Sequence, residues 1–441
     1  MTKKIAILLF ALVLAPGALP AQNETTDALI KSLAIKVKMY PGDYKAYAGL
    51  GAAYLQKGRE TGDSADYELA KAALSRSLDL MSNDPAAAFA MTQMAAACMA
   101  EHQFDQAYIW AQKALAVGSG DPSPWAIAGD ALADMGDYQN AADAYSMLKT
   151  VYGSEDEQQA ILYQRDSRMS YLRLVAGDAQ GAIQLMQGAV QTATAMHMPA
   201  ENIAWSDYQL GEEYFQTGDI AHAEQAYLAA LRLYPGYYRA LAGLAKVRSS
   251  AGNYRAAAAL YDKAIAAVPY PEYAAALGDV YRAIGDSNKA QKEFDLVEFI
   301  GHLSGINKQI HNRELALFYA DHGIKLDQAV VLARRELEVR HDVYTWDVLA
   351  WALFTNGESK EAAAAMSNAL SHGTKDAQLF FHAGMIYADL DDSLQARAFL
   401  QQALAINPHF HPIYAETARQ TLANLSTKTG SSPIQEAANA R

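Results

Sequence analysis

The sequence contains very little cysteine and little charge. Only one of its 441 residues is a cysteine, Cys98. A lone thiol cannot form an internal disulfide, so packing has to stabilise the fold. Cys98 lies in the run MAAACMA and is typical of a small core residue. Charged residues make up 19% of the chain and apolar residues 51%, a balance that excludes an intrinsically disordered protein.

Basic residues are scarce. Lys and Arg together number 36 against 49 Asp and Glu, which gives a net charge of −13. Nucleic-acid backbones and anionic membrane surfaces are bound by clustered Lys and Arg. The acidic balance therefore predicts that nucleic acid is not a partner and that anionic membranes are not bound.

Long hydrophobic runs are limited to the N-terminus, MTKKIAILLFALVLAPGALPAQ, which has two lysines, one apolar run and a Pro-Gly break. This pattern predicts a cleavable secretory signal over residues 1–21. The run is too short for a membrane span. We therefore expect an exported protein, periplasmic or secreted, with no membrane insertion after signal cleavage. The short signal favours a Gram-negative bacterial host.

Catalytic and cofactor motifs are missing too. No H-E-x-x-H, G-x-S-x-G or P-loop pattern occurs. Gly49 and Gly51 lack the third glycine and the preceding strand of a dinucleotide-binding fingerprint. ADLDDS at 388–393 lacks the glycine and glutamate of a calcium loop, and His409 and His411 lack further metal ligands. We expect no enzyme, no cofactor and no metal.

What the sequence does contain is a repeat. The stretch LGEEYFQTGDIAHAEQAYLAALRLYP begins at Leu210 and ends at Pro235. Its pattern of small residues, tyrosine, glycine and proline returns 34 residues later and again after another 33. Positions three and four apart share one face of a helix, so the pattern predicts two antiparallel helices. Gly211 lets them approach, and Gly218 ends the first helix while Asp219 caps the second.

These residues resemble the tetratricopeptide repeat, a helix-turn-helix unit of 34 residues. The small residue of the second helix recurs ten times, at Ala70, Ala107, Ala141, Ala182, Ala223, Ala257, Ala290, Ala329, Ala362 and Ala396. The resemblance implies an all-α fold, a right-handed α-solenoid of about ten units over residues 42–408. Around it we expect an N-terminal helix in 22–41, a capping helix over 409–425 and a disordered tail over 426–441.

The units are uneven. The unit of Ala182 has Ser170 and Arg173 where glycine and tyrosine are expected. Longer spacings predict extended helices or loops near 150–203 and 296–313, and the first unit carries the insertion GRETGDSAD between its helices. Departures from a repeat are candidates for binding sites. An enzyme or glycan-binding module built on these loops is therefore a rival interpretation, which a compact non-helical insertion or converging acid and His residues would favour.

In this family, first-helix residues away from the packing stripe line a concave groove. The resemblance places twelve such residues in the groove here: Arg168, Tyr171, Tyr208, Glu212, Phe215, Arg239, Lys246, Asp279, Arg282, Arg313, Trp351 and Phe381. Aromatic side chains mixed with both charge signs suit a protein or peptide partner. The alternative is that several of them only cover neighbouring helices.

The function that the resemblance implies is a non-catalytic scaffold or adaptor for protein–protein interaction. Some family members clamp a partner's terminal carboxylate with Lys, Asn and Arg. The corresponding positions here hold Tyr208 and Glu212, or Ala242 and Lys246, so that mode is not implied. A subunit of an envelope polysaccharide or outer-membrane export or assembly complex is a further possibility. The sequence predicts neither the partner nor the oligomeric state.

Overall fold

The computed structural model describes residues 25–81, 85–118, 120–149, 154–306 and 312–430. This part of the chain forms α-helices and one short 3₁₀ turn, and it contains no strand. The helices are α1 (Thr26–Met39), α2 (Tyr44–Thr61), α3 (Ser64–Leu80), α4 (Ala88–Ala100), α5 (Phe104–Ala116), α6 (Ser123–Asp134), α7 (Tyr138–Ser146), α8 (Glu155–Val175), α9 (Ala179–Ala195), α10 (Ala200–Gln216), α11 (Ile220–Leu233), α12 (Tyr238–Ser250), α13 (Tyr254–Ala267), α14 (Pro271–Ile284), α15 (Ser287–Ile306), α16 (Asn312–His322), α17 (Leu326–Glu336), α18 (Val343–Thr355), α19 (Ser359–Leu370), α20 (Ala377–Asp389), α21 (Ser393–Ile406) and α22 (Tyr414–Gly430).

In several helix pairs a glycine of the first helix faces a large side chain of the second. A Cβ added to Gly211 of α10 would lie 2.5 Å from the ring of Tyr227 on α11. Only glycine lets the two helices come this close. Gly129 meets Tyr145 in the same way. The glycine pattern of the sequence therefore serves packing.

The turns between paired helices are also built as the sequence predicts. Gly218 has a positive φ of 83° and follows α10. The Asp219 carboxylate accepts a hydrogen bond from the His222 backbone N–H and caps α11. In the turn between α20 and α21, Asp391 has the positive φ that glycine has in the other turn, and the Asp392 side chain caps α21. The predicted all-α solenoid of helix pairs is confirmed.

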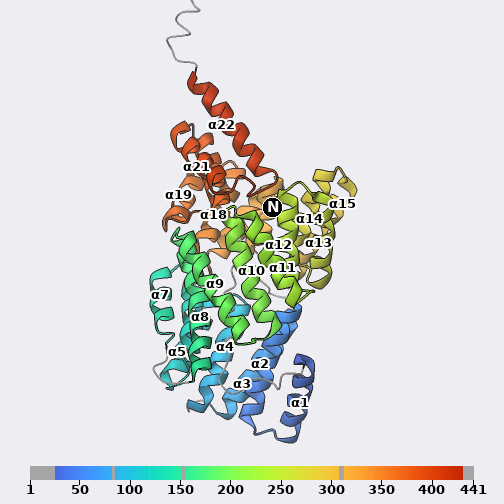
Figure 1. Ribbon diagram of the computed structural model, residues 1–441, viewed down its shortest axis with the longest axis vertical. Coiled ribbons are helices and arrows are strands. Elements are labelled where there is room, and N and C mark those ends of the chain that lie inside the picture. The colour runs from blue at the N-terminus through green and yellow to red at the C-terminus, as the bar shows by residue number, and fades with distance from the viewer. Residues whose placement is uncertain (1–24, 82–84, 119, 150–153, 307–311, 431–441) are drawn as a thin grey trace, which may run out of the picture.

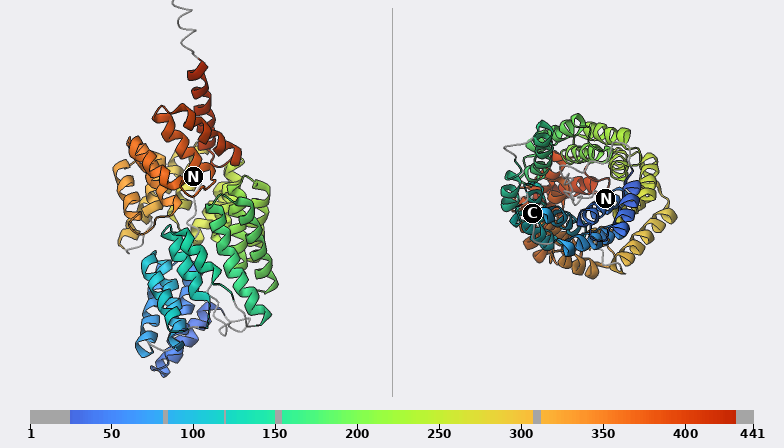
Figure 2. Two further views of the ribbon diagram at one scale, coloured as in Figure 1. Left: turned by 90° about the vertical axis from the view of Figure 1, so that its left-hand side faces the viewer. Right: turned by 90° about the horizontal axis from the view of Figure 1, so that it is seen from below.

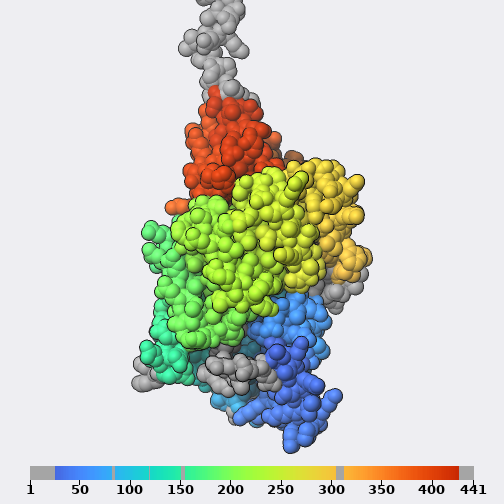
Figure 3. All heavy atoms as spheres, turned by 45° about the vertical axis from the view of Figure 1, so that its right-hand side comes forward, coloured from blue at the N-terminus to red at the C-terminus, as the bar shows by residue number. Residues whose placement is uncertain are grey.

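The pairs wind into a right-handed superhelix that makes more than one turn (Figures 1 and 2). Seen from the N-terminal end, the chain runs clockwise as it recedes, and the yellow segment comes round to the side where the blue segment began. In Figure 3 the green and yellow helices sit directly on the blue ones. Helices far apart in sequence are therefore neighbours in space.

Both ends of the array carry an additional helix. At the N-terminal end, α1 packs Ile30, Leu33 and Val37 against the first repeat. At the other end, α22 contributes Ala418 and Leu425 to the apolar core. It runs to Gly430, five residues into the segment predicted to be a disordered tail, and residues 431–441 lie outside the described part.

The irregular regions are helical where the structure describes them. The insertion GRETGDSAD lengthens α2 and α3 and leaves only Gly62 and Asp63 between them, so its interpretation as an interhelical insertion was wrong. α8 has 21 residues and begins with a capping box of Ser154 and Glu157, and α15 has 20 residues. Long helices take up the wider spacings here, and the described residues of 150–203 and 296–313 contain no compact non-helical insertion. Within the described ranges, no helix combines the length and hydropathy of a membrane span.

Candidate functional site: the inner surface and the seam between turns

The first helix of each pair forms the inner wall of the superhelix. Neighbouring first helices, such as α10 and α12 or α18 and α20, contact each other more than any two second helices in the described chain. Helices on the inside of a curve are closer together than those outside it. The inner wall is therefore crowded, and α4, α10, α18 and α20 are buried on nearly all sides.

The twelve predicted groove residues lie on these inner helices with unequal exposure. Less than a tenth of the surface remains exposed for Arg168, Tyr171, Tyr208, Phe215, Asp279, Arg313, Trp351 and Phe381. Glu212, Arg239 and Lys246 are half-buried, and Arg282 is exposed. Many of the buried ones contact the next helix pair, as the alternative interpretation expected. That any of the twelve contacts a partner stays a prediction.

Arg168 links three helices. Its guanidinium donates two hydrogen bonds to the Asp130 carboxylate, at 2.8 and 2.9 Å, and one to the Gln164 carbonyl. The Tyr145 hydroxyl donates to the same carboxylate at 2.9 Å. Burial raises the pKa of Asp130 to about 6, although the arginine opposes the shift. The residue therefore acts as a buried brace between α6, α7 and α8.

Glu212 and Lys246 form the corresponding contact between the next inner helices. The Glu212 carboxylate accepts hydrogen bonds from the Tyr227 hydroxyl at 2.6 Å and from Lys246 Nζ at 2.5 Å. Lys246 Nζ also lies 4.4 Å from the centroid of the Phe215 ring. These three predicted groove residues are thus brought together; Glu212 and Lys246 retain partial exposure along one edge of α10 and α12, and Phe215 is buried.

Two Asp–His pairs lie on the inner helices of the C-terminal half. His322 Nε2 lies 3.0 Å from Asp279, and His382 Nδ1 lies 3.0 Å from Asp347. Such a pair can move a proton when it faces a nucleophile or a substrate. His382, however, is fully buried and stacks on Trp351 with ring centroids 4.2 Å apart. Its surroundings are those of a packed aromatic core.

Arg239 lies in a cluster of tyrosines that was only partly predicted. Its guanidinium lies 5.2 Å from the Tyr238 ring. Tyr208, Tyr237 and Tyr273 connect to the same cluster through ring contacts. Burial raises the pKa of these tyrosines well above the ordinary value, so their hydroxyls stay protonated. The tyrosine cluster could have been predicted from the segment YPGYYRAL, because aromatic residues follow one another there at the start of a repeat.

The two turns of the superhelix touch along a line of loops, which we call the seam. It comprises the turns at Gly62, Gly136, Gly177 and Gly218 and the facing segments at Val268, His341, Gly373 and Ile406–Asn407. A Cβ at any of these four glycines would lie within about 2.6 Å of the facing segment. Each contact joins loops eleven helices apart, for example α6–α7 with α17–α18.

Hydrogen bonds cross the seam at each of its later contacts. The His341 N–H donates to the Asp134 carbonyl at 3.1 Å, and the Val343 N–H donates to the Tyr138 hydroxyl at 3.0 Å. The Thr374 hydroxyl donates to the Val175 carbonyl at 2.6 Å. At the last contact, Asn407 Nδ2 donates to the Phe215 carbonyl at 2.7 Å. Sequence reasoning missed the seam entirely.

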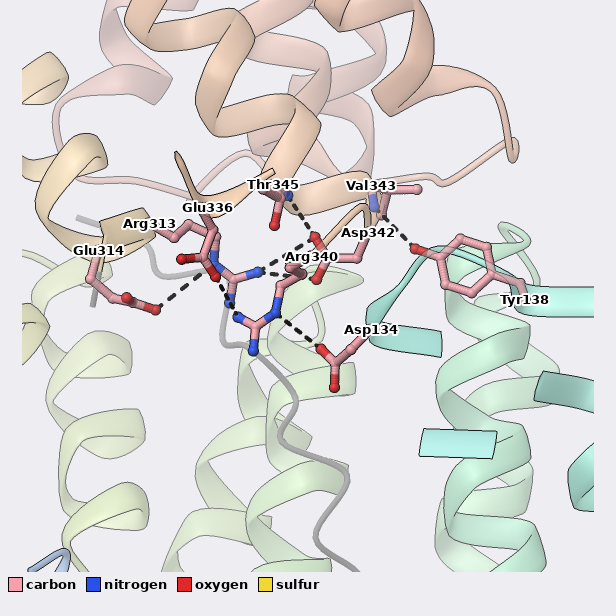
Figure 4. Close-up of polar contacts among 9 residues, drawn as sticks. All are labelled: Asp134, Tyr138, Arg313, Glu314, Glu336, Arg340, Asp342, Val343 and Thr345. Atoms are coloured by element: carbon pink, nitrogen blue, oxygen red, sulfur yellow. Dashed lines mark hydrogen bonds and ion pairs between the residues drawn. The ribbon is translucent and has the colours of Figure 1, made fainter. Parts of the chain in front are cut away.

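A buried cluster of charges lies at the middle of the seam (Figure 4). Arg340 Nε lies 3.2 Å from Asp134 of the other turn, and its Nη1 lies 3.5 Å from Glu336. Arg313, one of the predicted groove residues, pairs instead with Asp342 at 3.1 Å. Burial raises the pKa of Asp134 to about 7, although the Arg340 charge opposes the shift. The cluster can hold the turns in register and can take up or release a proton.

The histidines of PHFHP are not arranged as metal ligands. His409 is exposed, whereas His411 is buried and its Nδ1 accepts hydrogen bonds from the backbone of Ile413 and Tyr414. Burial lowers the pKa of His411 well below its ordinary value, so the ring is neutral. Throughout the described ranges, no three His, Cys, Asp or Glu side chains gather as metal ligands would.

Comparison with known families identifies the repeat. A family model described as tetratricopeptide repeat matches residues 208–271 and 243–296, and a second one of the same description matches 377–410. The chain is a tetratricopeptide repeat protein. The matched segments are α10 to α15 and α20–α21, in which the glycine, tyrosine and alanine pattern is most regular.

Several solved structures are similar to the chain. A tetratricopeptide repeat protein from Parabacteroides merdae has 17% identity and a TM-score of 0.35, with 60% of this chain and 99% of that one covered. MamA has 21% identity and a TM-score of 0.31, with 40% and 96% covered. The APC/C hetero-tetramer Cut9–Hcn1 has 13% identity and a TM-score of 0.35, with 91% and 93% covered. No curated protein matches by sequence.

Proposed function

We propose that this tetratricopeptide repeat protein is a non-catalytic scaffold outside the cytoplasm, which holds a protein or peptide partner against its inner wall. The observation that carries the proposal is that helix pairs account for nearly all of the described chain. The inner wall places aromatic rings beside charges of both signs, as at Glu212, Lys246 and Phe215. This mixture is typical of protein-binding surfaces.

Crosslinking from matched positions tests the proposal. Arg282 lies on the inner helix α14 and Arg334 on the outer helix α17, and their side chains are about equally exposed, at 49% and 53%. A photoreactive amino acid at Arg282 is expected to capture a discrete partner in intact cells, whereas the same residue at Arg334 is not. Equal capture from both positions, or none from either, would contradict binding at the inner wall.

Export is tested separately. Cleavage after Ala21, predicted from the apolar N-terminal run, gives a mature chain that begins at Gln22. The intact mass of protein purified from the extracytoplasmic fraction is expected to match this shortened chain. A full-length mass, or recovery from the cytoplasm alone, would overturn the proposed location and leave the inner-wall proposal standing.

A further inference from the structure

The seam is made by loops and turns and hardly by helices. All of the extensive helix–helix contacts in the described chain join helices that are neighbours or next neighbours in sequence. Across the seam the contacts in the described chain are single hydrogen bonds, close glycine approaches, the charge cluster and a small apolar patch, in which Val343 and Tyr344 join the cluster of Leu172 and Val175. An interface with few helix–helix contacts and only a small apolar patch can separate while the helices on either side stay packed.

The charged groups that the later turn contributes to the seam sum to zero, whereas the earlier turn adds one more carboxylate. The later turn contributes Arg313 and Arg340 together with Glu336 and Asp342, so these four charges cancel. The earlier turn adds a fifth group, the Asp134 carboxylate, at 3.2 Å from Arg340. An ionised Asp134 therefore leaves one negative charge in excess inside a buried cluster, which is costly.

Among the residues that the structure describes, the other charged and titratable groups near Asp134 do not remove this excess. Asp130, on the same helix, is already paired with Arg168 of α8. On α7, Tyr138 uses its hydroxyl to accept from the Val343 backbone. His341 contacts the Asp134 carbonyl through its backbone N–H. Glu314 lies 3.8 Å from Arg313 at the partly exposed margin and only adds negative charge.

We propose that the seam is a reversible clasp, which opens without unfolding either turn, and that a proton on Asp134 keeps it closed. In the closed state the charges of the five buried groups, Arg313, Arg340, Glu336, Asp342 and Asp134, sum to zero when Asp134 carries the proton. When the turns separate, water solvates Asp134 and the carboxylate ionises as it would on any surface. The raised pKa of about 7 in the closed state agrees with this arrangement.

The direction of the pH effect follows from linkage. Because the closed-state pKa of Asp134 lies above its ordinary value of 3.8, closure is most favourable below that ordinary value. It weakens as the pH rises through about 7. Opening would change access to the inner wall beside the seam, where Tyr171 belongs to the same apolar cluster as Val343 and Tyr344. A role of the clasp in controlling access of a partner to the inner wall rests on the proposed function, whereas opening of the clasp itself does not need a partner.

Spin labels on either side of the seam test the clasp in the full chain without a partner. Gln139 follows Tyr138 and Ser371 precedes His372, both positions are exposed, and the Tyr138 and His372 rings lie 4.7 Å apart. Cysteines at these positions can be labelled selectively, because Cys98 is buried and burial raises its pKa to about 12. Pulsed dipolar spectroscopy is expected to give one short distance in acid and a second, longer one whose population grows as the pH rises through about 7.

Three controls make the outcome decisive. The pair Gln139 and Arg173 lies within one turn, where α7 contacts α8, and its distance should not change with pH. D134N should stay closed throughout, and D79N on the exposed side of α3 should behave as the wild type. A wild-type distance that is unchanged in alkali, or a D134N chain that opens like the wild type, would overturn the proposal. If D134N fails to fold by circular dichroism, the wild-type titration alone decides.

Discussion

At the scale of single residues, Glu213 shows how this fold uses buried carboxyl groups. It is 3% exposed on α10, and its nearest polar partner is the Ser170 hydroxyl. Burial raises its pKa to about 8, so the group is neutral in the folded protein at neutral pH. Ser170 stands where the repeat expects glycine, and its hydroxyl also donates to the Ala182 carbonyl at 2.9 Å. A departure from the repeat thus serves packing here.

Glu213→Gln is expected to flatten the dependence of stability on pH. The folded pKa of Glu213 lies above the ordinary 4.5, so its contribution is complete below 4.5 and is lost as the pH rises through about 8. Glutamine carries no proton to lose, so the variant should keep on the order of a few kcal/mol more stability than the wild type at alkaline pH. Chemical denaturation at several pH values measures this. If the free energy of unfolding changed with pH in the same way for both proteins, Glu213 would be ionised in the folded state.

A second prediction at this scale compares two helical glycines. The Tyr227 ring lies between Gly211 and Gly243, within 2.5 Å of a Cβ at either position, whereas nothing lies within 4 Å of a Cβ at Gly188. Gly211→Ala should therefore cost about 1 to 3 kcal/mol through overpacking. Gly188→Ala should stabilise by roughly 0.5 to 1 kcal/mol through helix propensity. Thermal unfolding of both variants separates the effects, and a neutral Gly211→Ala would refute the close-approach argument.

At the scale of helices, the repeat pattern of the sequence predicts contacts within one helix pair but not contacts between distant helices. The spacing of Gly211, Gly218 and Tyr227 specifies one helix pair, because its partner helix lies within one repeat. Asp134 and Arg340 meet across eleven helices, and no periodicity connects them. For the same reason, the mixture of charges on the inner helices indicated a binding groove, while the structure uses Arg168 and Arg313 for buried ion pairs.

The last helix offers a test at this scale. The Tyr414 hydroxyl of α22 donates to Asp321 of α16, which also accepts from Trp351 Nε1 at 2.8 Å. Tyr414→Phe keeps the ring stacking on Phe381 and removes only the hydrogen bond. Because the acceptor is a half-buried carboxyl group, the loss should be about 1 kcal/mol, with faster amide exchange in α22. A Gln420→Ala variant on the exposed face of α22 is the control and should change little.

At the scale of the whole molecule, the seam changes how the array should unfold. A repeat array in which each unit contacts only its neighbours loses structure from its ends, whereas this one ties its last loop to its middle. Asn407, 1% exposed, donates from Nδ2 to the Phe215 carbonyl at the end of α10, 192 residues earlier. Asn407→Ala should therefore raise hydrogen exchange in two separated places, the α21–α22 loop and the last turn of α10. Because the lost bond leaves a buried carbonyl without its donor, protection in both places should fall by about 1 to 3 kcal/mol. Exchange mass spectrometry resolves the two segments, with α4 as an internal reference that should not respond. An increase limited to the α21–α22 loop would mean that the two turns unfold independently.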